Sequence, residues 1–538
     1  MPSTPTTKSQ VQAYQFVLRR MQSALVRRDA VMLHDPMRTH TRATIVGVIL
    51  AALGMIAFIV VGFFSASPAV PDGGNIVIGK ESGAVYVVAG NPKTLVPTFN
   101  LASARLYLMA QQNKGGGAQG SAGGSAVQPT VISDEQLKDI PRGRLTGIVD
   151  APQLLPNKDQ RISDDWAICD KTIIDPTLPP QTAAEKATTE TTVFGGVPQL
   201  GTELGNNEAL LVTGDNGTSY LIYRLPYNPN RPNANAVRAQ IDPNKTSVAT
   251  ALGLPKKGRH ISMGMLNAIP EVEMLTPPEI AGAGSTSTFD LGGLQTGDVF
   301  ETSRGNQPVF YAILQNGIQE VSQATAAMIR FERSPSSRGE MPQESPEKVS
   351  RVPQVRAEDQ GALKVDNMPQ GIPTVLDAGK GSPVSCLGWN IVNAGTANED
   401  AHTAVYVSSD MPGPKDQNQV LNIRQQSPDG LKIDHFYMPP GRAAVVRSAT
   451  SKASFTTGPI SLISDRGLRY GVPDMPTATG LGLDNPRPAP DAIIRLLPTG
   501  ASLNTTDVRR NYDSVPVDPR AGEFPTQQPQ AQGTQPGN

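Results

Sequence analysis

The sequence predicts a single-pass membrane protein whose large exported part has a strand-rich α+β fold. Three observations predict this class. One uncharged apolar run fills residues 43–64, four strand-turn-strand units recur after it, and each unit leads into a helix-start signal. Antiparallel hairpins with helices set apart from them are typical of α+β structures. We therefore expect four strand-turn-strand-helix repeats around a central domain.

A chain of 538 residues is long enough for several domains. In chain order we expect a basic amphipathic helix (1–42), a membrane span (43–64), an exported repeat part (65–510) with a central domain near 353–457, and a disordered tail (511–538). The tail is rich in Pro, Gln and Gly, and residues 111–128 are rich in Gly, Ser and Ala. Such compositions do not bury enough apolar surface to fold. Residues 511–538 are therefore predicted to be a disordered tail, and residues 111–128 a linker or loop insert.

The first 42 residues carry seven cationic and two acidic side chains, a net charge of about +5. Apolar side chains recur there at three- and four-residue spacing, which places them on one helix face. The expected helix runs from Val11 to Met32, and its stripe consists of Val11, Tyr14, Leu18, Met21, Leu25 and Met32. So short a segment has no core of its own, so we expect the stripe to dock on a partner protein; an anionic membrane surface and a marginal helix are the alternatives.

Residues 43–64 read ATIVGVILAALGMIAFIVVGFF and contain no charged residue. A run of this length crosses a bilayer as one helix. Its basic flank lies on the N-terminal side, and the next cation is Lys80. The positive-inside rule therefore places residues 1–42 in the cytoplasm and the rest of the chain outside. A cleaved signal peptide is the alternative, but the basic segment and the apolar run are both longer than signal peptides usually have.

The four repeats are predicted from turn and cap residues. The hairpin turns are expected at Gly90-Asn91, Asn216-Gly217, Asn316-Gly317 and Arg466-Gly467, and the helix caps at Asn100, Asp242, Ser322 and Asp474. After three repeats a short helix ends at a proline, in residues 137–141, 266–270 and 494–498. The continuation of the third repeat, residues 333–354, is predicted to be a polar loop. Residues 353–457 show short strands without the repeat pattern.

Cys169 and Cys386 are the only cysteines, and both lie in the exported part. An oxidising compartment permits them to pair, and two unrelated buried thiols are the alternative. Trp166 and Trp389, the only tryptophans, each lie three residues from a cysteine. This spacing suggests that they pack around such a bridge.

The stretch GGNIVIGKES (73–82) has the spacing of a phosphate-binding loop, with Gly74, Gly79 and Lys80 at the expected positions. A true loop continues with Ser or Thr to hold Mg²⁺, whereas Glu81 stands here, and residues 75–78 are mostly β-branched and predict a strand. Nucleotide binding at these three residues is therefore the weaker alternative, and ATP is the cofactor it would require.

No other chemistry is predicted. The five histidines are scattered without metal-ligand spacing, so the sequence predicts no metal site, no catalytic residue and no cofactor. The formal net charge of the chain is -1, so the part beyond the basic helix carries about −6. This charge argues against nucleic acid as a partner.

Several motifs resemble the EccB family of the type VII (ESX) secretion system. They are VQAYQFVLRRMQSALVRRDAVMLHDPMR before the span and SGAVYVVAGNPKTLVPTFNLASARL after it, followed in order by DDWAICD, GMLNAIPE, DRGLRYGVPD and IIRLLPTGASL. The likeness extends from residue 10 to about residue 504. The chain departs from the family at GRLTGIVDAP, which replaces its usual GIPGAP turn, and at the apparent insertion KGGGAQGSAGGS.

The resemblance implies a structural component of an inner-membrane secretion complex, with a cytoplasmic N-terminal helix, one span, and an elongated periplasmic part of four repeats flanking a disulfide-bonded central domain. It implies as partners the motor ATPase EccC, EccD, EccE and a mycosin protease, with self-association in the periplasm. Some family members are labelled ATPases, so nucleotide hydrolysis is the alternative function. A peptidoglycan-binding anchor is a third possibility, and it rests on analogy of fold alone.

Overall fold

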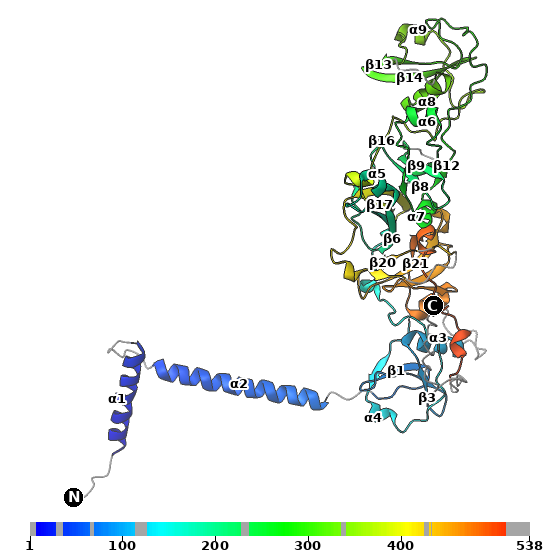
Figure 1. The fold of residues 1–538 in the computed structure, drawn as a ribbon. Coiled ribbons are helices and arrows are strands. Elements are labelled where there is room, and N and C mark those ends of the chain that lie inside the picture. The colour runs from blue at the N-terminus through cyan, green and yellow to red at the C-terminus, as the bar shows by residue number, and fades with distance from the viewer. Residues whose placement is uncertain are drawn as a thin grey trace, which may run out of the picture. The chain divides into compact units, whose positions relative to one another are not determined.

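The structure is a computed structural model that describes residues 7–27, 36–64, 69–112, 126–226, 236–334, 340–423, 430–431 and 433–512 (Figure 1). The chain divides into two compact units, Met1–Val70 and Pro71–Asn538. The predicted linker lies largely, and the predicted tail almost wholly, outside the described residues.

The first unit consists of two helices, α1 (Lys8–Arg27) and α2 (Pro36–Phe64). Helix α2 contains a stretch, Thr41–Val60, that is long and apolar enough to cross a membrane, and none of that stretch is buried by the protein. A helix that is apolar on all sides and exposed in water would be unstable, which is why this composition is typical of a membrane span. The helix begins seven residues before the predicted span, at Pro36, because a proline is well tolerated in the first turn.

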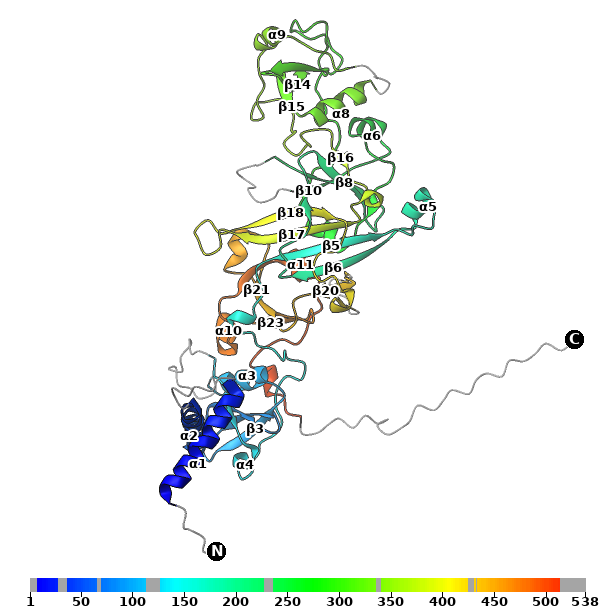
Figure 2. The same ribbon diagram turned by 90° about the vertical axis from the view of Figure 1, so that its left-hand side faces the viewer.

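The second unit (Figure 2) contains four copies of one structural repeat. Each copy has three antiparallel strands in the order 1-2-3 and a helix after the third strand. The first repeat comprises β1 (Asn75–Gly79), β2 (Val85–Ala89), β3 (Thr94–Thr98) and α3 (Leu101–Gln112). The second comprises β8 (Glu208–Thr213), β9 (Ser219–Arg224), β10 (Ala236–Gln240) and α6 (Thr246–Ala251). The third comprises β13 (Val299–Arg304), β14 (Gln307–Leu314), β15 (Gly317–Val321) and α8 (Gln323–Arg333), and the fourth β21 (Ala443–Ala449), β22 (Ile460–Ser464), β23 (Arg469–Val472) and α10 (Met475–Leu481).

After its helix, the chain of each repeat returns and adds to both edges of its own sheet. It first runs parallel to strand 1, as β4 (Thr130–Ile132), β11 (Arg259–His260) and β24 (Arg487–Pro490) do, and as a bridge between Gln343 and Glu301 does in the third repeat. A short helix follows, namely α4 (Asp134–Leu137), α7 (Met263–Ala268), α9 (Pro346–Ser350) or α11 (Asp491–Ile494). The chain then runs parallel to strand 3, as β12 (Glu271–Val272) does beside β10.

A proline at the equivalent position follows the short helix in all four repeats, including the third. The carbonyl oxygens of Pro141, Pro270, Pro353 and Pro498 each accept a hydrogen bond from the third strand, whose donors are the amides of Leu95, Arg238, Ile318 and Arg469. The prediction of a polar loop over residues 333–354 is therefore wrong. Val349 and Val352 are buried there and have the spacing seen in the other repeats. Charged neighbours (Glu347, Lys348 and Arg351) surround these two valines in the sequence, which is why the apolar signal was weak.

Most of the predicted turns and caps lie where expected. The amides of Ser103, Thr325 and Thr477 donate to the side chains of Asn100, Ser322 and Asp474 at the starts of α3, α8 and α10. The cap predicted at Asp242 is wrong, because α6 begins only at Thr246 and the Asp242 carboxylate closes a turn by accepting from Asn244. The turn at Asn216-Gly217 joins strands 1 and 2 of its repeat, whereas the other three join strands 2 and 3.

Between the repeats lies a seven-stranded central sheet with the order β19-β20-β6-β5-β17-β18-β7. Its main strands are β5 (Trp166–Ile173), β6 (Thr188–Gly195), β17 (Val384–Val392) and β18 (Asp400–Ser408), with β7 (Thr202–Glu203), β19 (Leu421–Asn422) and β20 (His435–Tyr437) at its edges. The central domain expected near 353–457 therefore differs from the observed one. The sheet also takes three strands from 166–203, namely β5, β6 and β7, and β21 belongs to the fourth repeat.

Remaining elements are α5 (Pro180–Glu185), between β5 and β6, and β16 (Thr374–Val375), which pairs with β8. The described residues also form short 3₁₀ turns at Lys158–Gln160, Ala378–Lys380, Gln417–Gln419, Lys452–Phe455 and Asp507–Arg509. The second and third repeats are an insertion between strands β7 and β17 of the central sheet.

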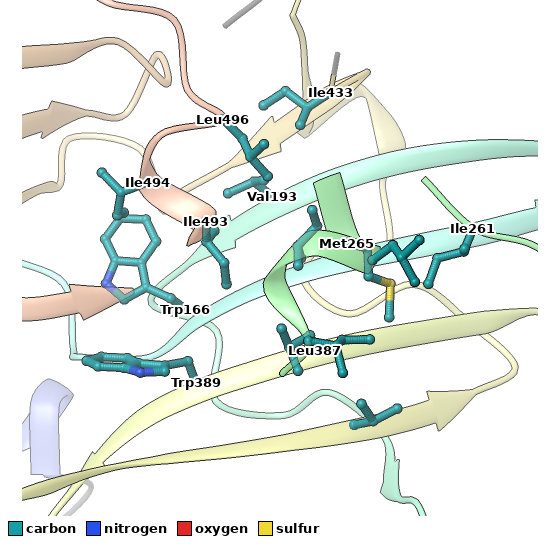
Figure 3. Close-up of a cluster of buried hydrophobic side chains, with 14 of the residues drawn as sticks. Trp166, Val193, Ile261, Met265, Leu387, Trp389, Ile433, Ile493, Ile494 and Leu496 are labelled. Atoms are coloured by element: carbon teal, nitrogen blue, oxygen red, sulfur yellow. The ribbon is translucent and has the colours of Figure 1, made fainter. Parts of the chain in front are cut away.

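The repeats associate in pairs through equivalent helices. Helix α6 packs against α8 to join the second and third repeats, and both views place them side by side (Figures 1 and 2). Helix α3 packs against α10 to join the first and fourth repeats. The short helices α7 and α11 pack together and against β5, in the largest apolar cluster of the protein (Figure 3). The central sheet therefore joins one pair of repeats to the other.

Candidate functional sites

The part of the apolar stripe that lies on α1 is exposed, whereas Met32 lies outside the described residues. The exposed fractions are 45% for Val11, 68% for Tyr14, 37% for Leu18, 53% for Met21 and 82% for Leu25. Phe16, Val17 and Val26, which lie off the predicted stripe, are also exposed. The exposed apolar surface of α1 is thus broader than the sequence pattern suggested. Its role as a partner-docking helix stays a prediction.

The stretch that resembles a phosphate-binding loop is a strand. Residues Asn75–Gly79 form β1, which pairs with β2 on one side and with β4 on the other. A phosphate loop needs free backbone amides that point at the ligand. Here the amide of Gly79 donates to Ala84 and that of Lys80 to Ile132, so the sheet and its turn already use them.

The two glycines of this stretch have structural reasons. Gly74 has φ +88°, a left-handed conformation that favours glycine, where the chain enters β1. A Cβ atom on Gly79 would clash with the Asp134 carboxylate and the Ser82 hydroxyl. The Asp134 carboxylate accepts from the amide of Ser82 at 2.8 Å, and that of Glu81 accepts from the amide of Asp134 at 2.8 Å. Two carboxylates thus occupy the place where a phosphate would lie, which disfavours a nucleotide there.

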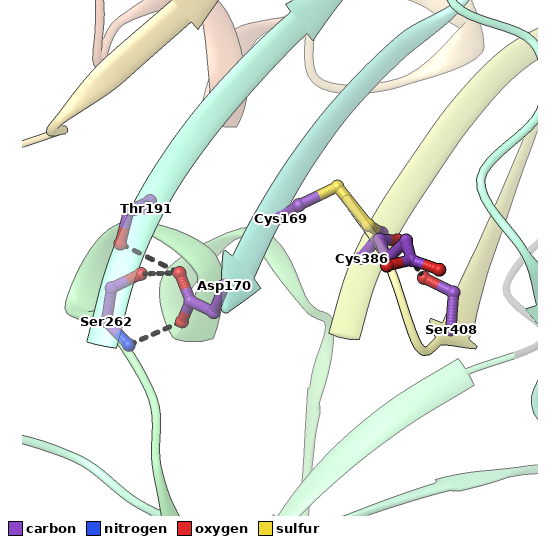
Figure 4. The surroundings of a disulfide bond; sticks show 7 residues. Cys169, Asp170, Thr191, Ser262, Cys386 and Ser408 are labelled. Carbon is purple, nitrogen blue, oxygen red and sulfur yellow. Dashed lines mark hydrogen bonds between the residues drawn. A yellow bond between two sulfur atoms is a disulfide. The ribbon is translucent and has the colours of Figure 1, made fainter. Parts of the chain in front are cut away.

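Cys169 and Cys386 form a disulfide in the structure (Figure 4). They lie directly opposite each other on the neighbouring strands β5 and β17, and both are fully buried. The predicted packing of the two tryptophans around this bridge is wrong. Trp166 and Trp389 also face each other across β5 and β17, but they belong to the apolar cluster on the other face of the sheet. Residues three apart on a strand point to opposite faces, which explains the difference.

Next to the disulfide, Asp170 is a buried carboxyl group that the sequence reading missed. Its oxygens accept from the Thr191 hydroxyl at 2.8 Å, from the Ser262 amide at 2.7 Å and from the Ser262 hydroxyl at 2.9 Å (Figure 4). Burial raises the pKa of the Asp170 carboxyl, although these hydrogen bonds and the nearby His260 oppose the shift. The sequence held one signal, since Asp170 continues the inward alternation of Trp166 and Ile168.

Because Ser262 is the N-cap of α7, Asp170 fixes the start of that helix to the central sheet. Two arginines make similar links between the parts. The Arg105 guanidinium, on α3, donates to the Leu481 carbonyl at the end of α10 at 2.6 Å, and burial lowers its pKa. Arg487, on β24, donates to Asp164 at 2.7 Å. The side chains of Asp170, Arg105 and Arg487 therefore lie at junctions between parts of the fold, and they orient those parts.

Among the residues that the structure describes, no three or more His, Cys, Asp or Glu side chains are grouped in a way that could hold a metal ion. Two pockets formed by the described residues have volumes of about 700 Å³ and 790 Å³. The first lies between the second and third repeats and the second lies on the central sheet, and neither includes Gly74, Gly79 or Lys80.

Residues 3–517 match the family described as type VII secretion system ESX-1, transport TM domain B, EccB. The chain is 27% identical to the ESX-3 secretion system ATPase EccB3 of Mycolicibacterium smegmatis, over 96% of this chain and 93% of that protein. It is 28% identical to the ESX-5 secretion system ATPase EccB5 of Mycobacterium marinum, over 96% of each chain.

Solved structures have the same fold. A chain in the structure of an intact ESX-5 inner membrane complex matches with a TM-score of 0.63 and 24% identity, over 98% of this chain and 99% of that one. A chain in the structure of an EccB3 dimer from the ESX-3 core complex matches with a TM-score of 0.62 and 24% identity, over 81% of this chain and 100% of that one. Because the family match spans nearly the whole sequence, from the exposed helix α1 to the last described strand pairing, this chain belongs to the EccB family of type VII secretion components.

Proposed function

We propose that this protein is a structural component that anchors and assembles the inner-membrane complex of a type VII secretion system. One observation carries the proposal. A single chain joins an exposed apolar helix and a membrane-span helix to a unit of four repeats braced by a central sheet. Such a chain provides a docking surface on one side of a membrane and a rigid scaffold on the other.

Related proteins of known structure support the proposed role in assembly and extend the proposal to location and self-association. The related structures come from an ESX-5 inner membrane complex, its periplasmic assembly and an EccB3 dimer. By analogy, the N-terminus of this protein lies in the cytoplasm, the repeats lie in the periplasm, and the repeats self-associate. The basic charge of residues 1–42 favours this orientation. The proposed partners are the motor ATPase EccC, EccD, EccE and the mycosin protease.

Docking by α1 is tested by adding the same charge at a position on the apolar stripe and at a position off it. In Leu18→Glu the new carboxylate lies within the apolar stripe, and in Gln12→Glu, the matched control, it lies about a quarter turn or more away. Each tagged full-length variant is purified from its native membrane in mild detergent, and the co-purifying proteins are quantified by mass spectrometry. We expect Leu18→Glu to lose the motor ATPase at least tenfold and Gln12→Glu to keep it. Equal recovery with both variants would show that the stripe is not the docking surface.

A nucleotide hydrolase is the second candidate, because several relatives are named ATPases. The structure of residues 75–79 does not favour it, since both edges of that strand are paired. The ATPase rate of the purified protein, with and without Lys80→Ala, separates the two functions. Hydrolysis that Lys80→Ala abolishes in a folded protein would support the hydrolase.

A further inference from the structure

We propose that the pocket of about 790 Å³ on the central sheet binds an acidic segment of polypeptide, with Lys171 and Lys415 as the cations that recognise it. The pocket lies against the sheet face that carries the disulfide. Its walls are two loops, residues 196–199 after β6 and residues 410–415 after β18. Its base includes side chains of the sheet itself, Lys171 on β5 and Tyr437 on β20.

The pocket walls are rigid. Four prolines line the pocket, namely Pro198, Pro412, Pro414 and Pro439. Proline fixes φ, so these segments lose little conformational freedom when a ligand binds. The second loop also lies directly on aromatic rings, because a Cβ atom on Gly413 would be 3.2 Å from Phe194 and 3.5 Å from Tyr437. Those two rings pack against each other with centroids 6.2 Å apart. The pocket is therefore preformed.

The charges in the pocket favour an anion. Within the described part of the chain, neither Lys171 nor Lys415 forms an ion pair. Glu190 lies opposite Lys171 on the neighbouring strand, but its carboxylate is 3.7 Å from the His435 imidazole. Asp410, the acidic residue of the lining, accepts from the Ser409 hydroxyl at 2.9 Å. Two lysines and one acidic residue thus line the pocket, and Lys171 is half-buried on the sheet.

The shape and the apolar lining favour a peptide over a small ion. A volume of about 790 Å³ lies within the range that encloses drug-sized ligands, far larger than a phosphate ion. Proline rings, Met411 and the Tyr437 ring offer apolar surface to side chains that flank an acidic residue. A carboxylate between two lysines forms charge-assisted hydrogen bonds, which are stronger than neutral ones.

Binding is tested with the full-length protein in detergent and a fluorescein-labelled peptide, (Asp-Pro-Leu)₃, by fluorescence anisotropy. We expect the affinity to fall at least tenfold in Lys171→Gln and in Lys415→Gln, and to fall with added salt. Lys158→Gln and Lys452→Gln remove exposed lysines outside this pocket and should leave the affinity unchanged. Lys415 lies on an exposed loop, so its variant keeps the test valid even if Lys171→Gln does not fold.

Two further measurements distinguish an acidic peptide from a neutral peptide and from a small anion. The peptide (Asn-Pro-Leu)₃, which lacks the carboxylates, should bind at least tenfold more weakly than the acidic peptide. Inorganic phosphate at 10-fold excess over the acidic peptide should not displace it. Equal affinity of all four lysine variants, equal binding of the neutral peptide, or full displacement by phosphate would each overturn the proposal.

Discussion

Asp170 joins the central sheet to the second repeat, and its burial makes the stability of that junction depend on pH. The groups around it are the hydroxyls of Thr191 and Ser262, the amide of Ser262 and the nearby His260. Because the pKa of Asp170 in the folded protein is raised above 3.8, the folded protein keeps a proton that the unfolded chain has already released. The free energy of unfolding therefore falls as pH rises from 3.8 through the folded pKa.

We expect Asp170→Asn to remove this part of the pH dependence and to keep the junction intact. An amide still accepts from the Ser262 amide, and the two hydroxyls can rotate to accept from its NH₂ group. Asp170→Ala leaves the Ser262 amide without an acceptor and should lower the free energy of unfolding by about 1–3 kcal/mol. Urea unfolding at a series of pH values measures both effects. If the slope with pH is the same in wild type and Asp170→Asn, the carboxyl does not titrate differently on folding.

In the stretch that resembles a phosphate-binding loop, we expect alanine substitution to affect stability at Gly79 but not at Lys80. Gly79→Ala should destabilise the first repeat by about 1–3 kcal/mol, because the added methyl group meets the Asp134 carboxylate and forces it to move. Lys80→Ala, at an exposed position, should change stability by less than about 0.5 kcal/mol. Thermal unfolding compares the two variants. A nucleotide site would instead give Lys80→Ala a large effect on ligand-induced stabilisation by ATP.

The short helix that ends at a proline is the element that completes each repeat. In the third repeat Val349 and Val352 bury their side chains in a cluster with Phe300, Tyr311 and Ile318. The same segment supplies the Pro353 carbonyl that accepts from the amide of Ile318. Apolar packing and one strand-edge hydrogen bond therefore support each other.

We expect Val352→Ala to cost about 1–3 kcal/mol and to speed amide hydrogen exchange in β15, because the cavity loosens the segment that pairs with this strand. Arg351→Ala is the matched control. It removes only an exposed ion pair with Glu347, and such pairs contribute about 0–1 kcal/mol. Exchange measured by mass spectrometry on peptides that cover β15 tests the prediction. Faster exchange in the control but not in Val352→Ala would contradict it.

Local chemistry made some elements predictable and others not. Asn100, Ser322 and Asp474 are predictable as caps because their side chains bond to amides three residues away. The central sheet is not predictable as one body, because β5 and β17 pair across more than 200 residues and nothing local encodes that pairing. The membrane span and the apolar stripe of α1 are predictable from composition and periodicity alone. The role of Asp170 depended on a partner, Ser262, from a distant repeat.

At the scale of the whole molecule, the second and third repeats form an insertion that leaves the central sheet after β7 and returns at β17. The Cys169–Cys386 disulfide closes this insertion at its base, with a sequence separation of 217 residues. The paired helices α6 and α8 hold the inserted repeats together, and α7 ties them to the sheet through Asp170. The disulfide therefore stabilises the connection on which the placement of both inserted repeats depends.

Replacing both cysteines, in Cys169→Ala with Cys386→Ala, should lower the free energy of unfolding by about 2–5 kcal/mol. The main reason is that the bridge restricts the unfolded chain, and a long loop gives a large restriction. Guanidinium unfolding of the full-length protein in detergent, followed by tryptophan fluorescence, reports on the central sheet through Trp166 and Trp389. The wild type unfolded with a reductant present is the control, and it should match the double variant. Equal midpoints for the oxidised wild type and the double variant would show that the strand pairing alone holds the base of the insertion.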